Sequence, residues 1–146
     1  MITIAHRGNL TGPEPDKENH PIYLTTAVEK GFDCEIDVWY INGQIMLGHD
    51  KPQYTVNLDF INNNHFWCHA KNLQALEMML DEGVHCFWHE HDERTLTSRG
   101  YIWTYPHKST VASKSIICMT RPEQIAPSNC LGICTDWVYN HNDNSM

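Results

Sequence analysis

Short apolar runs alternate with stretches of helical spacing in the first half of the chain. The apolar run at 2–5 ends abruptly at His6-Arg7-Gly8, as a buried strand does where it leaves a sheet. After a polar loop, Pro21 is placed to begin a helix, and apolar residues recur at helical spacing until Lys30 and Gly31. This pattern predicts a strand, a loop and a helix in succession.

Two strand-like runs, 33–41 and 44–50, flank Asn42-Gly43, a strong signal for a β-hairpin with antiparallel strands. A two-residue turn would place His49 opposite Ile36, whereas a three-residue turn with a bulge would pair His49 with Asp37. The sequence leaves this register open. In both cases we expect His49 close to the acidic residues of the first strand.

The rest of the chain predicts many strands and few helices. A strand at 66–71 precedes a helix that ends at Gly83, and residues 140–146 have the polar composition of a frayed tail. Strand and helix alternation favours an α/β fold with a largely parallel sheet. Further strands, separated by short or absent helices, are predicted over 84–91, 101–105, 115–119 and 131–136.

Size and composition predict one globular domain over residues 1–146, since 41% of the residues are hydrophobic and 19% are charged. The formal net charge of -8 repels polyanions, so we expect no nucleic-acid partner, and an anionic substrate would need a local cation. No apolar run is long enough for a membrane span, and the N-terminus lacks a signal-peptide pattern. We therefore expect a cytoplasmic protein, in which the six cysteines are mostly buried, reduced thiols.

Glu35 and Asp37 are candidate metal ligands. Residues at i and i+2 on a strand point to the same face, and the neighbours of these two acids are apolar. Paired acids on a buried strand need compensation, which a hard cation such as Mg²⁺ or Ca²⁺ supplies. The alternative is an exposed strand face with solvated carboxylates.

Five polar motifs follow one another in the first fifty residues: His6-Arg7-Gly8, Glu18-Asn19, Gly31-Phe-Asp-Cys-Glu35-Ile-Asp37-Val, Asn42-Gly43 and His49-Asp50. Their order resembles the N-terminal signature of the glycerophosphodiester phosphodiesterase family. Two later segments also resemble it: Trp103-Thr104 is similar to a late barrel strand, and Gly132-Ile-Cys-Thr-Asp136 is similar to the last strand. The resemblance implies the phospholipase-C-like version of the TIM barrel.

The resemblance also implies roles for individual residues. His6 and His49 would be the catalytic acid and base pair, Glu35 and Asp37 would bind the metal ion, and Arg7 and Lys71 would contact the substrate phosphate.

The chain departs from the family pattern at His69. The family usually has Glu-x-Lys where this chain has His69-Ala70-Lys71. If His69 is the third metal ligand, an imidazole would shift the preference from Mg²⁺ or Ca²⁺ towards Mn²⁺, Co²⁺ or Zn²⁺. If it is not a ligand, it could donate a hydrogen bond to phosphate.

The chain is also short for the implied fold. A complete eight-stranded TIM barrel takes about 250 residues, so we expect an abridged TIM-barrel-like fold with reduced helices in the second half. Exposed sheet edges in such a barrel could be covered by a second copy of the chain, in a homo-oligomer.

Candidates for a substrate pocket follow from the late strands and from the histidine-rich run at 89–92. His89 could reach the active face, and the rings of Trp103, Tyr105 and Trp137 could form a wall for a glycerol or alcohol group. Ordinary core packing of these rings is the alternative.

Together with these features, the resemblance implies an enzyme of lipid metabolism, a metal-dependent phosphoric diester hydrolase. It would convert a small glycerophosphodiester to an alcohol and a phosphomonoester. The alternatives are a phospholipase-type lyase of the same superfamily and a non-catalytic module that binds metal or phosphate.

Overall fold

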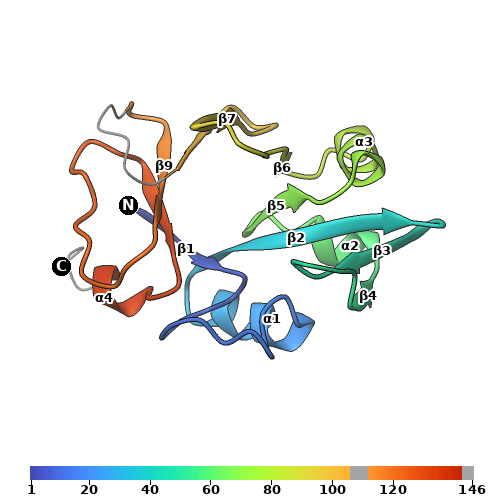
Figure 1. The fold of residues 1–146 in the computed structure, drawn as a ribbon, viewed down its shortest axis with the longest axis horizontal. Helices are drawn as coiled ribbons and strands as arrows, with labels where there is room; N and C mark the ends of the chain where they lie inside the picture. Colours follow the sequence, from blue (N-terminus) through green and yellow to red (C-terminus); the bar gives the residue numbers. More distant parts are fainter. Residues whose placement is uncertain (106–111, 143–146) are drawn as a thin grey trace.

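The computed structural model describes residues 1–105 and 112–142, which form a mixed α/β fold around one curled sheet (Figure 1). The helices are α1 (Pro21–Glu29), α2 (Leu58–Ile61), α3 (Leu73–Asp81) and α4 (Tyr139–Asn142). The strands are β1 (Ile2–His6), β2 (Asp33–Ile41), β3 (Gln44–Leu47), β4 (Tyr54–Val56), β5 (Phe66–Ala70), β6 (Cys86–Phe87), β7 (Arg94–Leu96), β8 (Ile102–Thr104), β9 (Ser115–Met119) and β10 (Gly132–Thr135).

The main part of the sheet is parallel, with strands in the order β6-β5-β2-β1-β10-β9-β8. Antiparallel pairing joins β2 to β3, β3 to β4 and β7 to β8. Within the described residues, β6 and β8 are not paired by backbone hydrogen bonds. The segment around β7 lies between them and contacts the chain at and after β6. Ser98 N donates to Cys86 O at 2.8 Å, and Thr95 Oγ1 donates to Trp88 O at 2.8 Å.

Side chains from opposite ends of this sheet meet in a common interior. The ring centroids of Trp103 and Phe87 lie 4.7 Å apart, and those of Trp103 and Trp67 lie 5.9 Å apart. The curl of the sheet therefore brings β8 within contact of β5 and β6. The buried side chains of this interior are Ile4, Trp67, Phe87, Trp103, Ile116 and Cys134.

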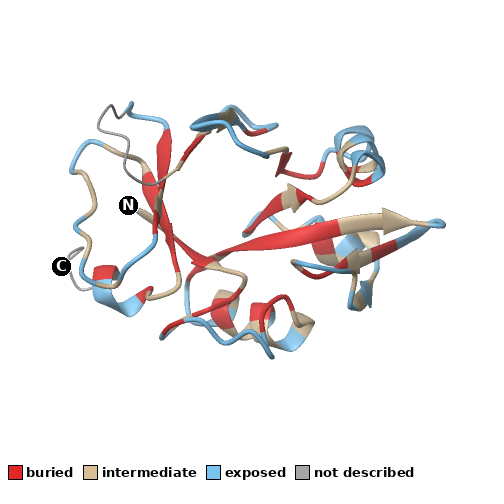
Figure 2. Ribbon diagram, in the orientation of Figure 1, coloured by how far each residue is buried: buried red, intermediate tan, exposed pale blue. Residues whose placement is uncertain are grey.

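The second core lies between the other face of the sheet and the helices. Leu24 of α1 and Met79 of α3 are fully buried there against β2, whose Cys34, Ile36 and Val38 point towards the helices. Figure 2 shows buried positions on α1 and α3 and along most of β2. β2 is therefore covered on both faces, with Cys34, Ile36 and Val38 towards the helices and Glu35 and Asp37 on the opposite face.

The sequence patterns predicted this α/β organisation and the scarcity of helices in the second half, and both are confirmed. Within the described residues, no helix occurs between α3 and α4. The strand predicted over 84–91 is wrong in extent, because only Cys86 and Phe87 pair with β5 before the chain leaves the sheet. β4, α2 and β7 were not predicted.

The predictions for the C-terminal tail and for the cysteine thiols can both be compared with the structure. The chain is helical through Asn142, and His141 is buried, so fraying from residue 140 is wrong for this part; residues 143–146 lie outside the described residues. The prediction of free thiols is confirmed for all six cysteines, four of which are buried. In the described part of the chain, every helix is too short or too polar to cross a lipid bilayer.

The hairpin adopts the two-residue turn, with Ile41 paired to Gln44 and Val38 to Leu47. This register would continue to Ile36 opposite His49, but β3 ends first. Gly48 has a φ of 154°, and a Cβ there would collide with the carbonyl oxygen of Lys51. The turn at Gly48 takes His49 out of the β-hairpin. The side of the sheet on which its side chain lies therefore does not follow from the alternation of residues along β3.

Candidate functional site

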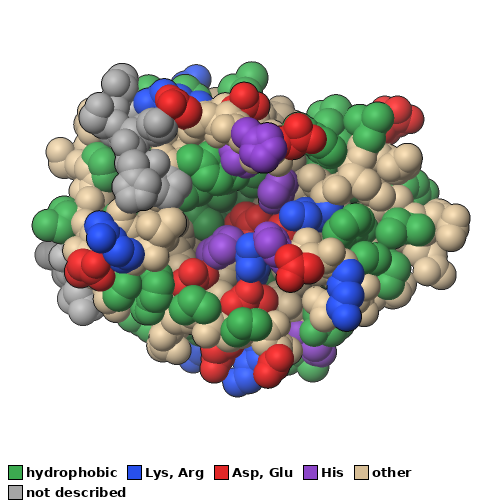
Figure 3. All heavy atoms as spheres, viewed as in Figure 1, with side chains coloured by type: hydrophobic (Ala, Val, Ile, Leu, Met, Phe, Trp, Pro, Cys, Tyr) green, Lys and Arg blue, Asp and Glu red, His purple; other side chains and the backbone are tan. Residues whose placement is uncertain are grey.

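A cavity of about 520 Å³ lies at the carboxyl-terminal end of the parallel strands. Figure 3 shows histidine, acidic and basic side chains gathered around a hollow whose floor is hydrophobic. The cavity therefore combines a charged rim with an apolar base. Its described lining consists of His6, Arg7, Glu35, Asp37, His49, His69, Lys71, His89, Glu90, Trp103, Tyr105, Cys118, Met119, Thr120, Cys134 and Asp136.

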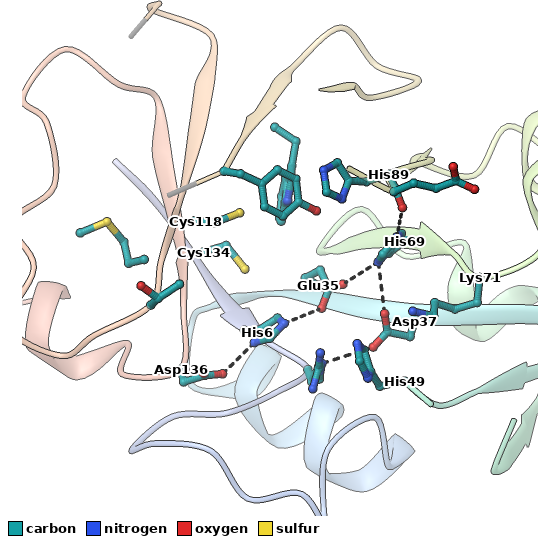
Figure 4. A pocket seen from close by; sticks show the side chains of 16 residues that line it. His6, Glu35, Asp37, His49, His69, Lys71, His89, Cys118, Cys134 and Asp136 are labelled. Carbon is teal, nitrogen blue, oxygen red and sulfur yellow. Dashed lines mark hydrogen bonds and ion pairs between the residues drawn. The ribbon is translucent and has the colours of Figure 1, made fainter. Parts of the chain in front are cut away.

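Glu35, Asp37 and His69 form a compact cluster in this cavity (Figure 4). Glu35 and Asp37 lie on one face of β2 and are 4% and 0% exposed, so the alternative of solvated carboxylates is wrong. His69 of β5 is the register partner of Asp37. Its Nδ1 lies 3.4 Å from Asp37 Oδ1 and 3.7 Å from Glu35 Oε2.

The charges of this cluster depend on one another. Burial opposes ionisation of Asp37, but His69, Asn19 and Arg7 outweigh burial and lower the pKa of Asp37 to about 2. Burial also disfavours the charged form of His69, yet its contacts with Asp37 and Glu35 raise its pKa to about 9. The two acids therefore favour the protonated form of His69.

The loop after β1 holds Asp37 in place. Asn19 Nδ2 donates to Asp37 Oδ2 and the Asp37 backbone N donates to Asn19 Oδ1, both at 2.9 Å. Arg7 donates from Nη1 to Glu18 at 3.1 Å and places Nε 3.5 Å from Asp37 Oδ2. Arg7 has a φ of 55°, so the backbone adopts a left-handed conformation at the residue that carries this guanidinium.

The donor atoms of the cluster fit a divalent metal ion. One ligand atom from each of Glu35, Asp37 and His69 lies within 4.8 Å of the others. Glu35 Oε1 and Asp37 Oδ1 are buried and accept no hydrogen bond. A buried carboxylate oxygen without a donor is costly, and a metal ion would satisfy both atoms.

His6 lies beside this cluster with its ring oriented by the last strand. Its Nδ1 donates to Asp136 Oδ1 at 2.9 Å, which leaves Nε2 facing the cavity, 3.8 Å from Glu35 Oε1. Asn9 Nδ2 donates to the same Asp136 oxygen at 2.9 Å. Burial lowers the pKa of His6, but the Asp136 hydrogen bond and the charges of Glu35 and Asp136 outweigh it, and the net shift is upward.

His49 and Lys71 line the same cavity on the other side of Asp37. His49 Nδ1 donates to Asp50 Oδ1 at 2.7 Å, so this ring also has Nδ1 bound to a carboxylate. Lys71 follows β5, where its backbone N donates to Val38 O at 2.8 Å, and Figure 4 shows its side chain directed towards Asp37. The structure thus brings together His6, Arg7, Glu35, Asp37, His49, His69 and Lys71.

Three of the four suggested pocket residues line the cavity. His89 stacks on Tyr105 with ring centroids 3.6 Å apart, and Trp103 lies at the base. Trp137 lies outside the lining, and this prediction is corrected. Its backbone N bonds to Thr135 Oγ1 as the chain turns after β10, and its indole lies against Gly12 instead.

Sequence reasoning missed the residues that orient the site. Glu18, Asn19 and Asp136 belong to the family-like motifs, but no role was assigned to them. Asn9 is 1% exposed and links Asp136, Glu18 and Tyr23, and no motif includes it. A polar residue in the loop directly after a strand that ends in His-Arg was the available signal.

Comparison of the chain with known protein families, curated proteins and solved structures gives no match.

Proposed function

We propose that this chain is a metal-dependent phosphodiesterase of the phospholipase-C-like superfamily, acting on a small phosphodiester of the glycerophosphodiester class. One observation carries the proposal: two carboxylate-bound histidines and a lysine converge on a buried set of metal-ligand atoms in one cavity. Phosphodiester cleavage needs a base, an acid and positive charge around the phosphate. We assign these tasks to His6, His49 and Lys71, which belong to the family-like motifs.

The strand order supports an abridged TIM barrel as the framework. Starting from β1, the parallel neighbours β2, β5 and β6 follow in chain order, and β8, β9 and β10 lead back to β1. A (β/α) barrel has its strands in such an order, and in the fold that we propose the segment around β7 would take the place of direct pairing between β6 and β8. The cavity lies at the carboxyl ends of the strands, where active sites of such barrels occur.

The geometry suggests how the side chains share the reaction. Nδ1 of His6 and Nδ1 of His49 are each bound to a carboxylate, so their Nε2 atoms are the groups free to exchange protons. One Nε2 would remove the proton from the attacking hydroxyl or water, and the other would donate a proton to the leaving oxygen. Lys71 would attract the phosphate. A divalent ion held by Glu35, Asp37 and His69 would supply additional positive charge.

The second candidate is a non-catalytic module that binds a phosphorylated ligand. It is favoured by the ion pairs of His69 with both acids, because an imidazolium at this point already compensates them. In that case the cavity would be electrostatically complete without a metal ion. Metal dependence of turnover separates the two functions.

The experiment is turnover of bis(p-nitrophenyl) phosphate with EDTA and with added Mg²⁺, Ca²⁺, Mn²⁺ or Co²⁺. We expect metal-dependent release of p-nitrophenol from the natural chain. The double variant Glu35→Gln/Asp37→Asn should lose at least about 10³-fold, because it removes both negatively charged ligands. The matched control is Glu77→Gln/Asp81→Asn, which makes the same chemical changes at exposed positions of α3 and should retain full activity.

Activity that survives in the Glu35→Gln/Asp37→Asn variant would contradict the metal proposal. Absence of turnover with every metal, together with retained binding of inorganic phosphate, would favour the non-catalytic module. With a glycerophosphodiester as substrate, ³¹P NMR of the products then separates a hydrolase from a lyase, since a lyase would accumulate a cyclic phosphate.

A further inference from the structure

The base of the cavity contains two neighbouring thiols to which the proposed reaction assigns no task. Cys118 of β9 and Cys134 of β10 are register partners in adjacent parallel strands, and both line the cavity. Cys134 is 3% exposed, whereas Cys118 is partly accessible. Figure 4 shows both sulfur atoms directed from their strands into the cavity, on the side of His6 and Glu35.

Three of the four other cysteines, Cys34, Cys68 and Cys130, donate thiol hydrogen bonds to backbone oxygens, at 3.6 Å, 3.9 Å and 3.0 Å. In the described part of the chain, neither Cys118 nor Cys134 donates one to an acceptor. Burial and the charge of Glu35 raise the pKa of both thiols, so both are protonated at neutral pH.

We propose that Cys118 and Cys134 form a dithiol site for a trivalent, monosubstituted arsenical, a thiophilic centre that binds two sulfurs and gives a neutral product. With phenylarsine oxide as the probe, two As–S bonds form and the As=O bond breaks. The two thiol protons leave with the oxygen as one water molecule. Arsenic remains trivalent, so no oxidant or reductant takes part.

The surroundings favour this class of ligand over a soft monovalent cation. A bis-thiolate of Cu⁺ would carry a negative charge, and Glu35 already places a buried carboxylate beside the thiols. An arsenic dithiolate is uncharged, which suits an apolar base. Trp103 and Tyr105 of the neighbouring wall offer aromatic surface to the phenyl group of the probe.

The chain contains an internal control with the same strand geometry. Cys68 of β5 and Cys86 of β6 are also register partners in adjacent parallel strands. Both lie in the core beneath the helices and are 0% and 1% exposed. If strand register alone decided binding, the two cysteine pairs would bind the arsenical equally well. We expect binding at Cys118 and Cys134 because the cavity gives access to this pair.

The test uses the folded natural chain and intact-protein mass spectrometry, which needs no enzymatic activity and is therefore independent of the proposed function. We expect one phenylarsenic adduct per chain, with peptide mapping to Cys118 and Cys134. A dithiol such as 2,3-dimercaptopropanol should remove the adduct far more readily than a monothiol. Cys118→Ser and Cys134→Ser should each weaken binding about 100-fold, because the second As–S bond is intramolecular.

Cys130→Ser is the matched control, since it removes a partly accessible single thiol and should leave binding unchanged. The proposal is overturned by an adduct that persists in Cys118→Ser, by mapping to Cys68 and Cys86, or by equal reversal with monothiol and dithiol. The reversal measurement uses the natural chain, so it decides the question even if a serine variant fails to fold. Complete absence of an adduct would also overturn the proposal.

Discussion

The segment before Gly83 and the segment after it contribute different things to the cavity. Among the described lining residues, the first supplies His6, Arg7, Glu35, Asp37, His49, His69 and Lys71. The second supplies a largely neutral wall of Trp103, Tyr105, Cys118, Met119, Thr120 and Cys134, together with His89, Glu90 and Asp136. Most charged and titratable side chains of the cavity therefore come from the first segment. The second segment forms the wall of the cavity and orients His6 through Asp136.

The two segments also differ in how they are stabilised. The first packs α1 and α3 against β2, so a helix layer buries the outer face of its strands. In the second, the described residues that pack with Ile117 and Ile133 on the outer face are Met119 and, from a loop, Ala126 and Cys130. The second segment therefore depends more on the interior contacts with β5 and β6 than on helices.

The largest expected effect tests the concentration of chemistry in the first segment. His6→Ala and His49→Ala should each lower kcat by about 10²- to 10⁴-fold, because each removes one partner of a proton transfer. If the two histidines serve one step, the double variant should be only slightly slower than the worse single variant. Steady-state kinetics on a phosphodiester measures this, with His65→Gln, at an exposed position outside the cavity, as the control. Multiplicative losses would mean that the histidines act in separate steps.

The next effect tests the interior contacts between the segments. Trp103 is 2% exposed and packs on Trp67 and Phe87, so Trp103→Ala should lower the free energy of unfolding by about 3–5 kcal/mol. The matched control is Trp39→Ala, which truncates a half-buried indole of the hairpin outside this interior. Urea unfolding followed by circular dichroism measures both. Equal losses would show that the interior is no more important than the hairpin.

His85 gives a pH-dependent version of the same test, because it packs between Trp67 and Tyr101 and bonds to Thr97 Oγ1 at 2.8 Å. Burial, helped by the positive charge of Arg99, lowers its pKa from 6.5 to about 4. The unfolded chain then binds more protons than the folded chain between these values. The stability that neutral His85 contributes is therefore complete above pH 6.5 and is lost as the pH falls towards 4.

The expected loss over this interval is roughly 3 kcal/mol, since one pKa unit corresponds to about 1.4 kcal/mol. Urea titrations at several pH values measure it as the difference between the natural chain and His85→Gln. The variant should show a shallower fall in stability on acidification, and His65→Gln, at an exposed position, should not. Parallel curves for the natural chain and His85→Gln would contradict the assignment.

Local patterns predicted the elements that depend on short-range chemistry. The strand predicted over 115–119 is β9 with the same bounds, and the helix begun by Pro21 is α1. The run 84–91 failed because its apolar residues are buried by the interior and by α3, not by extended pairing along the sheet. In so short a run, a buried segment and a paired strand show the same pattern of apolar residues.

In the candidate site too, local features were predictable from the sequence and long-range contacts were not. Side chains on β2 were predictable as a pair because i and i+2 share a face. The contacts Asn19–Asp37 and Asp136–His6 join residues far apart in the chain, so they depend on which strands become neighbours. The pairing of Cys118 with Cys134 likewise required the register of β9 and β10. No local spacing contains that information.

The smallest expected effect concerns His69, the residue at which the first segment departs from the family pattern. It lies close enough to Glu35 and Asp37 to be the third ligand, but its imidazole is a softer donor than a carboxylate. His69→Glu should therefore shift the preference of the proposed activity from Mn²⁺, Co²⁺ or Zn²⁺ towards Mg²⁺ or Ca²⁺, by about tenfold in relative kcat/KM. His69→Gln is the control, because it removes the imidazole without adding a charge. If His69 instead contacts phosphate, the glutamate variant should raise KM with the metal preference unchanged. If neither quantity moves, His69 serves only to neutralise the two acids, and the non-catalytic module becomes the better description of this cavity.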